Sequence, residues 1–248
     1  MDVLQESVIV YGSRRPNSAY IKISKSQDIF SPIFSRSVKR DLVITTDYIF
    51  IPASKQEEDV IRRMNSLPHD LKSIGLNVST GKVVDFRIRD FLCSSPSQNT
   101  YPMIYPSNIS ESIVVHPLER CKKPQWFLGD PEAAKLLVPP GSYVVVKRFS
   151  AKEERKRIVA AVWKSSSESA IDNKLNYFHF NGLPLSSKTA LGLTKWLNSK
   201  FVDSYFRIFS GHTQVNATDL RKMKYPSLEE LHELADKDDG WVDNGYFD

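Results

Sequence analysis

The chain has 248 residues, 41% hydrophobic and 25% charged, which is typical of a globular protein and excludes wholesale disorder. No apolar run reaches the roughly 18–20 residues of a transmembrane helix, and the N-terminus lacks the basic start and long apolar stretch of a signal peptide. We therefore expect no membrane partner. The two cysteines, Cys93 and Cys121, do not form a disulfide scaffold, so a cytoplasmic location is expected.

The net charge of +5 conceals an uneven distribution along the chain. Residues Leu228–Asp248 carry eight acidic side chains against Lys237, which leaves 33 basic and 21 acidic side chains in residues 1–227. A body this basic suits a polyanionic partner such as nucleic acid. A solvated basic surface that only keeps the protein soluble explains the charge equally well.

The first part of the chain is predicted to be rich in strands. Ser7–Tyr11, Ala19–Ser24 and Leu42–Ile51 have the composition of strands. In Glu57–Leu67 the apolar residues recur at helical spacing, so this range is predicted to be a helix. A first unit is expected to close near Leu71.

The middle of the chain is also predicted to be β-rich. Leu76–Arg89 has strand composition, and Cys93–Gly129 is rich in proline and aromatic residues, which favours edge strands and exposed turns. Tyr143–Phe149 is a clear strand, and Ile158–Trp163 is its expected hairpin partner.

The last third is predicted to be helical. Apolar residues recur at three- and four-residue steps over Lys188–Phe209, with Gly211 as a stop. We interpret the aromatic residues of this helix as core. Ser227 resembles a helix start that leads into the acidic tail. The expected fold is α+β, with a mainly antiparallel β core and a C-terminal helical support. Its expected division is 1–71, 72–227 and an acidic tail at 228–248.

The sequence carries no recognisable catalytic motif. It has no G-x-x-x-x-G-K-[ST] phosphate loop, no G-x-S-x-G elbow, no H-E-x-x-H helix and no glycine-rich dinucleotide fingerprint. The five histidines are scattered without metal-ligand spacing, and the two cysteines are interpreted as packing or surface thiols. No catalytic residue and no metal ligand is predicted.

Three segments have side chains suited to binding DNA. Val78–Lys82 combines hydroxyls with a glycine, Lys147–Arg157 is strongly basic beside aromatic residues, and Ser210–Ala217 is polar. Each also has a structural explanation: a turn that needs a left-handed glycine, a solvated hairpin tip, and turn or capping residues. The candidate DNA-binding residues are Ser79, Thr80, Lys82, Arg87, Lys147, Arg148, Arg155, Arg157, His212, Thr213, Gln214 and Asn216.

These segments, in this order, resemble the C-terminal half of adenine-specific DNA methyltransferases. The resemblance is to type II and fused restriction-modification enzymes with a TaqI-like target-recognition domain. The matching segments are Val3–Glu6, Val78–Arg87, Tyr143–Arg155 and Phe201–Leu220, and most strongly Asn198–Arg207, Ser210–Arg221 and Tyr225–Ser227. The resemblance implies that the chain recognises specific sequences in double-stranded DNA.

The sequence departs from the family in one important respect. The family's catalytic domain has a glycine-containing S-adenosylmethionine motif and an Asn-Pro-Pro-Tyr motif, whereas the double proline here is Pro139-Pro140 with Gly141 after it. The chain thus resembles the recognition half alone. We expect no cofactor binding and no methyl transfer by this chain by itself. The resemblance implies S-adenosylmethionine for the full enzyme, and a catalytic domain or subunit as partner.

Two other functions are possible alternatives for this sequence. An independent nuclease would use Asp85 and Asp90 with Lys82, but two residues five apart on a strand point to opposite faces. Alternatively, the protein is structural or inhibitory, and its acidic tail Leu228–Asp248 mimics DNA or masks the basic face.

Overall fold

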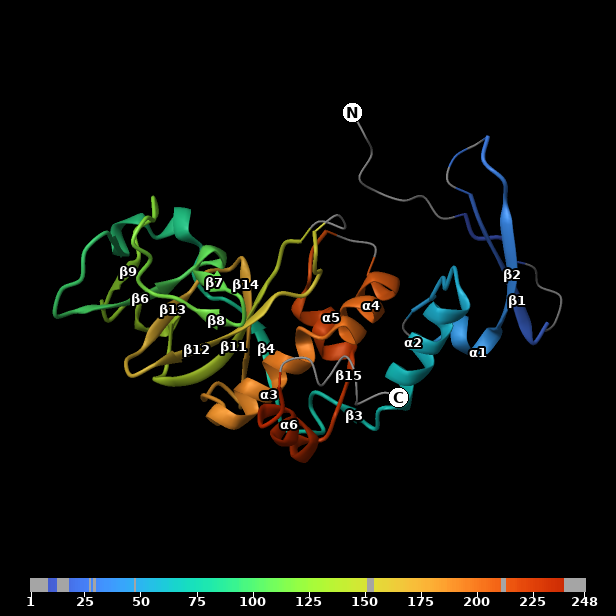
Figure 1. Cartoon of the computed structure of the whole chain (residues 1–248). Coiled ribbons are helices and arrows are strands. Elements are labelled where there is room, and N and C mark those ends of the chain that lie inside the picture. The colour runs from blue at the N-terminus through green and yellow to red at the C-terminus, as the bar shows by residue number, and fades with distance from the viewer. Residues whose placement is uncertain are drawn as a thin grey trace.

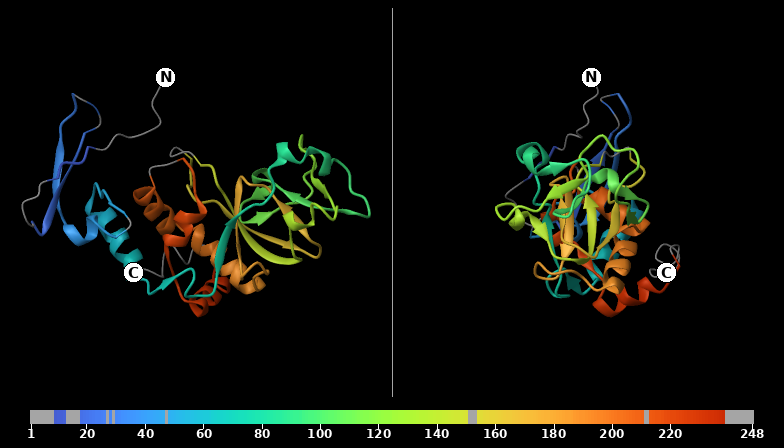
Figure 2. Two further views of the ribbon diagram at one scale, coloured as in Figure 1. Left: turned by 180° about the vertical axis from the view of Figure 1, so that it is seen from behind. Right: turned by 90° about the vertical axis from the view of Figure 1, so that its left-hand side faces the viewer.

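The structure is a computed structural model that describes residues 9–12, 18–26, 28, 30–46, 48–150, 154–210 and 213–238. The molecule is elongated (Figure 1). A two-stranded ribbon lies at one end, two larger sheets lie at the other, and helices fill the middle (Figures 1 and 2). Among the described residues no helix is both long and apolar enough to cross a membrane.

The N-terminal unit consists of the ribbon and two helices. Strands β1 (Tyr20–Lys25) and β2 (Phe34–Lys39) pair antiparallel, and helices α1 (Arg40–Val43) and α2 (Lys55–Ser66) follow. The Oγ of Ser54 caps α2 by accepting from the backbone N–H of Glu57 at 3.1 Å. The predicted helix over 57–67 is confirmed. The predicted first strand lies partly outside the described residues.

The predicted strand over Leu42–Ile51 is wrong. Leu42 and Val43 are the buried last residues of α1, and Ile44 and Ile49 form only an isolated bridge. The reason is local hydrogen bonding: the backbone N–H of Thr45 donates to the carbonyl of Tyr48 at 2.9 Å, and the Tyr48 N–H donates back to the Thr45 Oγ1 at 3.0 Å. This turn interrupts a run whose β-branched residues favour a strand.

The first large sheet has six strands in the order β4-β14-β11-β12-β8-β7. Its strands are β4 (Asn77–Thr80), β7 (Ile109–Ser110), β8 (Ile113–Val114), β11 (Gly141–Lys147), β12 (Ala160–Ser165) and β14 (Leu175–His179). The predicted hairpin of β11 and β12 is confirmed, with Val146 opposite Ala160.

The second sheet has five strands in the order β10-β13-β6-β9-β5. Its strands are β5 (Leu92–Cys93), β6 (Thr100–Ile104), β9 (Trp126–Leu128), β10 (Leu137–Val138) and β13 (Ser169–Ile171). Both large sheets are mixed, because β8 pairs parallel with β12, and β6 pairs parallel with β13. The α+β class is confirmed. The sheets are not purely antiparallel.

Single-turn helices connect several of these strands. They are η1 (Asp85–Arg87), η2 (Arg89–Phe91), η3 (Pro106–Asn108) and η4 (Ala134–Leu136).

Strand β11 is buried on both faces, which explains its continuous apolar run. Val144 and Val146 belong to the core that the helices share, whereas Tyr143 and Val145 belong to a second core on the other face. This strand therefore joins the helical half of the molecule to the sheet half.

The C-terminal third contains α3 (Ser187–Leu197), α4 (Lys200–Phe209), α5 (Ala217–Lys222), β15 (Lys224–Tyr225) and α6 (Leu228–Ala235). The single helix predicted over 188–209 is thus two helices. Ser199 caps the second by accepting from the N–H of Val202 at 3.2 Å. The side chain of Asn198 pairs with both backbone groups of Ala160, at 2.9 Å and 2.8 Å, which fixes the break against β12.

The expected boundary near Leu71 lies inside a continuous core. Helix α2 packs against α4, and Phe50 contacts the rings of Tyr205 and Phe209. Strand β3 (His69–Asp70) pairs with β15. The N-terminal unit therefore rests on the C-terminal helices. The helix start predicted at Ser227 is confirmed, and a capping box formed by Ser227 and Glu230 begins α6.

Candidate nucleic-acid interface

The ends of three strands that are far apart in the sequence lie side by side at one edge of the six-stranded sheet. Strand β4 ends at Thr80, β11 ends at Lys147, and β14 begins between them at Leu175. The register places Thr80 opposite Asn176 and Lys147 opposite Leu175. Because β14 runs antiparallel to both neighbours, two of the segments predicted to bind DNA reach the same edge.

Residues Thr213–Asn216 of the third predicted segment, Ser210–Ala217, join this edge. The backbone N–H of Val215 donates to the carbonyl of Arg148 at 2.7 Å, and Phe149 and Gln214 form an antiparallel bridge. Thr213 is exposed and Gln214 is half-buried. The strand end at Lys147 and this segment therefore form one surface.

The side chain of Asn176 links two parts of this edge. Its Oδ1 accepts from the Oγ1 of Thr80 at 3.1 Å, and its Nδ2 donates to the carbonyl of Val215 at 2.8 Å. Asn216 has a capping role at α5, because its backbone N–H donates to Asp219 at 3.1 Å and its Nδ2 contacts the same carboxylate oxygen at 3.2 Å. The geometry thus supports the structural explanation for Asn216.

Basic side chains gather at the same edge. Lys147 and Arg148 are half-buried, and the Nη1 of Arg148 donates to the carbonyl of Asn173 at 2.6 Å. The Arg148 guanidinium carbon lies 5.9 Å from the centre of the Phe149 ring, which is half-exposed. A cation beside an accessible aromatic ring suits contact with a phosphate and a neighbouring base.

A charged cluster lies behind the edge. The Nζ of Lys123 is 2.6 Å from one carboxylate oxygen of Asp85, and the Nζ of Lys174 is 3.5 Å from the other. The hydrogen bond from Lys123 holds the pKa of Asp85 below its ordinary value. Burial raises the pKa of Asp172, whose Oδ1 accepts from the backbone N–H of Lys174 at 2.6 Å. The cluster anchors the turn before β14. Lys174 was not among the residues predicted from the sequence.

The other candidates near β4 make structural contacts. The Nζ of Lys82 donates to the carbonyls of Lys135 and Leu137 at 3.2 and 3.1 Å. Ser79 contacts the Nε2 of His179 at 2.9 Å. Arg87 is exposed on η1, with its guanidinium carbon 5.6 Å from the centre of the Phe86 ring.

Gly81 is required by close packing. Its φ lies outside the left-handed region, so the left-handed turn considered from the sequence is not formed. A Cβ at this position would lie 2.1 Å from the carbonyl oxygen of Asp172. Glycine is needed here because two backbones touch.

The structure corrects one member of the basic segment. Arg157 is fully buried: its Nε donates to the Oγ of Ser150 at 3.1 Å, and its guanidinium carbon lies 5.6 Å from the centre of the Phe206 ring. It is therefore placed in the core rather than on a surface that DNA can reach. Arg155 is exposed. His212 lies outside the described residues.

The residues considered for a nuclease are not assembled as a catalytic group. Asp85 is paired with two lysines, and Lys82 donates to backbone carbonyls, as described above. In the part of the chain that the structure describes, no three His, Cys, Asp or Glu side chains are arranged to hold a metal ion.

The described part of the acidic segment packs away from this edge. Helix α6 lies against α3, where the Nζ of Lys188 is 2.6 Å from Asp236 and the Oγ1 of Thr189 is 2.9 Å from the Nε2 of His232. Residues 228–238 thus support the helices, and the rest of the predicted tail lies outside the described residues.

Histidine protonation is expected to destabilise the folded chain. The backbone N–H of Gly182 donates to the Nδ1 of His179 at 2.8 Å, so the proton of the neutral ring is on Nε2 and points to Ser79. Burial lowers the pKa of His179 below its ordinary 6.5, and the charges of Lys82 and Arg221 lower it further. The unfolded chain therefore binds a proton more readily than the folded chain.

The contribution of His179 to stability is thus complete above its ordinary pKa and is lost as the pH falls through the lowered value. Urea unfolding at about pH 7.5 and about pH 5.5 measures the loss. His179→Gln is expected to reduce the difference between the two conditions, and an unchanged difference would contradict this assignment.

The comparisons with known proteins agree with the resemblance seen in the sequence. The chain is similar to type II DNA methyltransferases. It is 38% identical to the type II methyltransferase M.PstI of Providencia stuartii over 259 aligned residues, which cover the whole chain and 50% of M.PstI. It is 41% identical to M.BsuBI of Bacillus subtilis over 94% of the chain and 48% of M.BsuBI. The chain therefore spans about half the length of these relatives.

The fold has a counterpart among solved structures. The type IIG restriction endonuclease BpuSI matches 86% of the chain and 32% of its own length, with a TM-score of 0.51 and 13% sequence identity. At this identity the likeness concerns the fold alone. A scan against models of protein families found none that matches the chain.

Proposed function

We propose that this chain is the DNA-recognition part of an adenine-specific DNA methyltransferase in a restriction-modification system. The observation that carries the proposal is the similarity of nearly the whole chain to one half of two type II methyltransferases. In the full enzyme, a catalytic domain or subunit would bind S-adenosylmethionine and transfer its methyl group to the amino group of adenine. This chain would bind and select the double-stranded DNA.

The division of labour has a physical basis. An enzyme that modifies a base must take that base out of the helical stack, so the rest of the duplex has to be held while one nucleotide is extruded. Contacts to phosphates position the duplex, and contacts to base edges select the sequence. A separate recognition part can supply both, without any catalytic residue of its own.

The edge formed by β4, β11, β14 and Thr213–Asn216 suits this role. Lys147 and Arg148 supply positive charge for phosphate oxygens, with Phe149 beside them. Thr213 and Gln214 supply hydroxyl and amide groups of the kind that read base edges in the major groove. Backbone pairing with Arg148, Phe149 and Ser150, the residues that follow β11, holds them next to the cations.

Lys147→Ala is expected to weaken binding to all duplexes about equally and to lower the slope of log affinity against log salt by about one unit. The matched control is Lys164→Ala, because Lys164 is an exposed lysine of the same sheet that lies opposite Ser142, at the other end of β11. Fluorescence anisotropy with labelled duplexes over a salt series gives both quantities. Equal slopes for wild type and both variants would mean that this edge is not the DNA face.

A base-reading residue is expected to behave differently. Gln214→Ala should cost roughly 1–3 kcal/mol on the preferred site and little on a scrambled duplex. The preferred site is obtained by selecting duplexes from a random library with the wild-type chain. A uniform loss on both duplexes would instead assign Gln214 to phosphate contact or to folding.

A further inference from the structure

The N-terminal ribbon exposes more large apolar side chains than a free surface normally does. Phe30 is 91% exposed, Ile33 72% and Phe34 74%. Ten of the seventeen exposed large apolar side chains among the described residues lie between residues 9 and 51: Ile9, Val10, Tyr11, Tyr20, Phe30, Ile33, Phe34, Ile44, Ile49 and Ile51. Apolar surface gathered in one region indicates an interaction site.

The register explains why this surface is left uncovered. Ile23 and Val38 lie on the face of the ribbon that packs into the helical core. Phe34 is on the same face as Val38, because side chains alternate along a strand, but it lies at the other end of β2 and is exposed. The helices thus cover this face near Val38 and leave its end at Phe34 exposed.

The ribbon also has unpaired edges. In the described residues β1 pairs only with β2, so the outer edge of each strand has backbone groups without a strand partner. A two-stranded ribbon is marginally stable alone, and a free edge accepts a further strand readily. These properties fit a ribbon that becomes part of a larger sheet.

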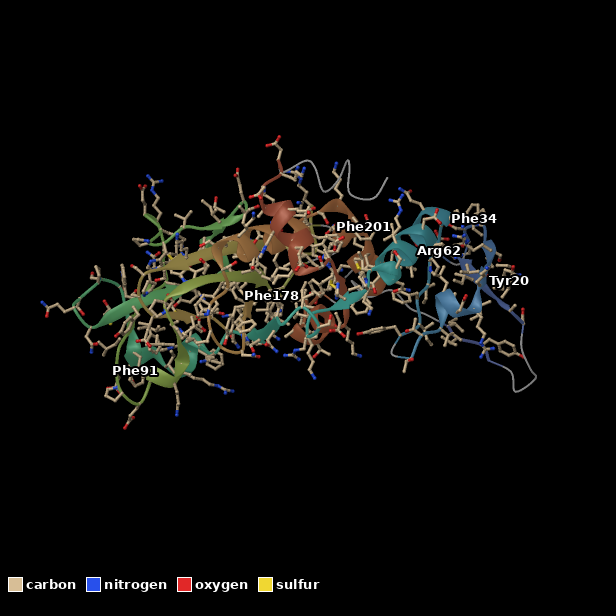
Figure 3. The ribbon with its side chains drawn as sticks, turned by 90° about the horizontal axis from the view of Figure 1, so that it is seen from below. Tyr20, Phe34, Arg62, Phe91, Phe178 and Phe201 are labelled. Carbon is tan, nitrogen blue, oxygen red and sulfur yellow. The ribbon has the colours of Figure 1, made fainter. Side chains whose placement is uncertain are left out.

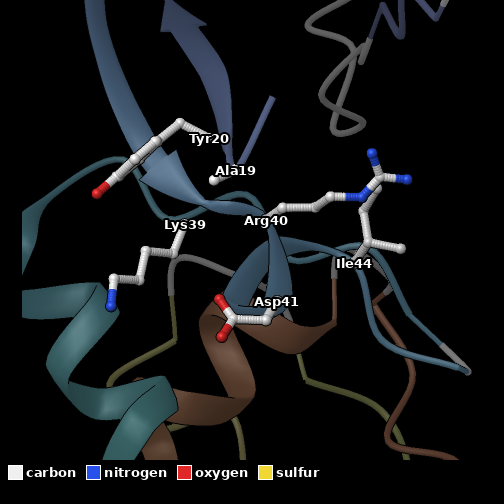
Figure 4. Close-up of a pocket in the computed structure, with 6 residues that line it drawn as sticks. All are labelled: Ala19, Tyr20, Lys39, Arg40, Asp41 and Ile44. Carbon is white, nitrogen blue, oxygen red and sulfur yellow. The ribbon is translucent and has the colours of Figure 1, made fainter. Parts of the chain in front are cut away.

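A hollow lies at the base of the ribbon, where the backbone N–H of Arg40 donates to the carbonyl of Ala19 at 2.9 Å. It has a volume of about 630 Å³, and Figure 4 shows Tyr20, Lys39, Arg40, Asp41 and Ile44 around it. The hollow combines aromatic, aliphatic, cationic and anionic groups, so it can receive a side chain of a protein partner.

The position of the ribbon favours a partner that binds together with DNA. Tyr20 and Phe34 lie at the opposite end of the molecule from Phe91, with Phe178 of the six-stranded sheet between them (Figure 3). The candidate nucleic-acid interface lies at one edge of that sheet, so the ribbon and this interface are separate surfaces (Figure 3). The aligned part covers only about half of M.PstI and of M.BsuBI. The other half of such a protein is large enough to supply this partner.

We propose that the β1–β2 ribbon docks on the part of the methyltransferase that this chain does not span. It adds its strands to the edge of a β-sheet in that part, and Phe30, Ile33 and Phe34 are buried on an apolar surface there. The proposal rests on the proposed function, because that function supplies the partner.

The test mixes this chain with the segment of M.PstI that lies outside the aligned half, expressed separately, and measures binding by calorimetry. The corresponding segment of M.BsuBI serves as a second probe. Wild type is expected to bind one to one. Phe34→Asp and Ile33→Asp are each expected to lower the affinity at least about 30-fold, as for a central interface residue. Leu183→Asp is the control, because Leu183 is 56% exposed but lies in the turn after β14.

Hydrogen exchange tests strand addition directly. Amide protons in residues 20–25 and 34–39 are expected to exchange more slowly when the segment is present. Unchanged exchange there, with binding intact, would overturn the strand addition. Thermal unfolding of each variant shows whether the chain is still folded. If either Phe34→Asp or Ile33→Asp is unfolded, the other variant is used for the test.

Parallel DNA binding separates this proposal from the proposed function. Phe34→Asp should retain wild-type affinity for DNA. Normal DNA binding without binding to either segment would overturn the docking and leave the proposed function standing. Binding to a segment without binding to DNA would overturn the proposed function and leave the docking standing.

Two further results would show another occupant of the ribbon. If sedimentation shows a dimer that Phe34→Asp disrupts, a second copy covers the ribbon. If Phe34→Asp abolishes DNA binding, the ribbon is a DNA surface. Either result overturns the docking.

Discussion

Arg157→Ala is expected to lower the free energy of unfolding by about 2–5 kcal/mol, an effect typical of removing a large, fully buried side chain. The guanidinium donates to the Oγ of Ser150 at 3.1 Å and lies over the ring of Phe206. Its backbone N–H donates to the carboxylate of Asp203 at 2.5 Å. Alanine leaves a cavity at this position. It also leaves buried acceptors such as the Ser150 Oγ without their hydrogen-bond donor, where water cannot replace it. Urea unfolding measures the change.

The control is two residues away in the sequence. Arg155→Ala removes the same charge from an exposed side chain and should change stability by no more than about 0.5 kcal/mol. The DNA affinities of the two variants are then compared at a temperature at which both are folded. A loss of affinity there reflects the lost charge and not unfolding. A stable Arg157→Ala with a reduced salt slope would return Arg157 to the DNA surface and contradict the packing.

The contrast between Arg155 and Arg157 shows what a local pattern cannot reveal. In the sequence they belong to one basic segment, but Arg157 is enclosed by residues of α4, which are distant in the sequence, as well as by Ser150. Burial depends on these tertiary contacts. The elements that were predicted correctly, α2 and the β11–β12 hairpin, have their signals within a few residues.

The candidate site was partly predictable for the same reason. Thr80, Lys147 and Gln214 were identified by residue type. The juxtaposition of Thr80 and Lys147 follows from the pairing of β14 with both β4 and β11, and Gln214 joins them through its bridge with Phe149. Lys174 and Asn176 were missed, although an Asp-Asn turn precedes them, because a single lysine before a strand and a single asparagine within it have no distinctive pattern. Only the sheet order gives them their neighbours.

Gly192→Ala is expected to lower the free energy of unfolding by about 3 kcal/mol, at the upper end of the usual cost of overpacking. Helix propensity alone predicts the opposite sign, because alanine in place of glycine inside a helix normally stabilises it by about 1 kcal/mol. In the folded chain a Cβ on Gly192 would lie 1.7 Å from the carbonyl oxygen of Leu231 in α6. The obstacle is backbone, so it cannot rotate away as a side chain would.

Relief of this clash requires α3 and α6 to separate, and the separation has further consequences. It would stretch the ion pair between Lys188 and Asp236, 2.6 Å long, and the contact between Thr189 and His232 at 2.9 Å. Leu191→Ala is the control, since Leu191 is an exposed neighbour on the same helix and should change stability by no more than about 0.5 kcal/mol. If Gly192→Ala instead raises stability, the two helices are further apart than the structure places them.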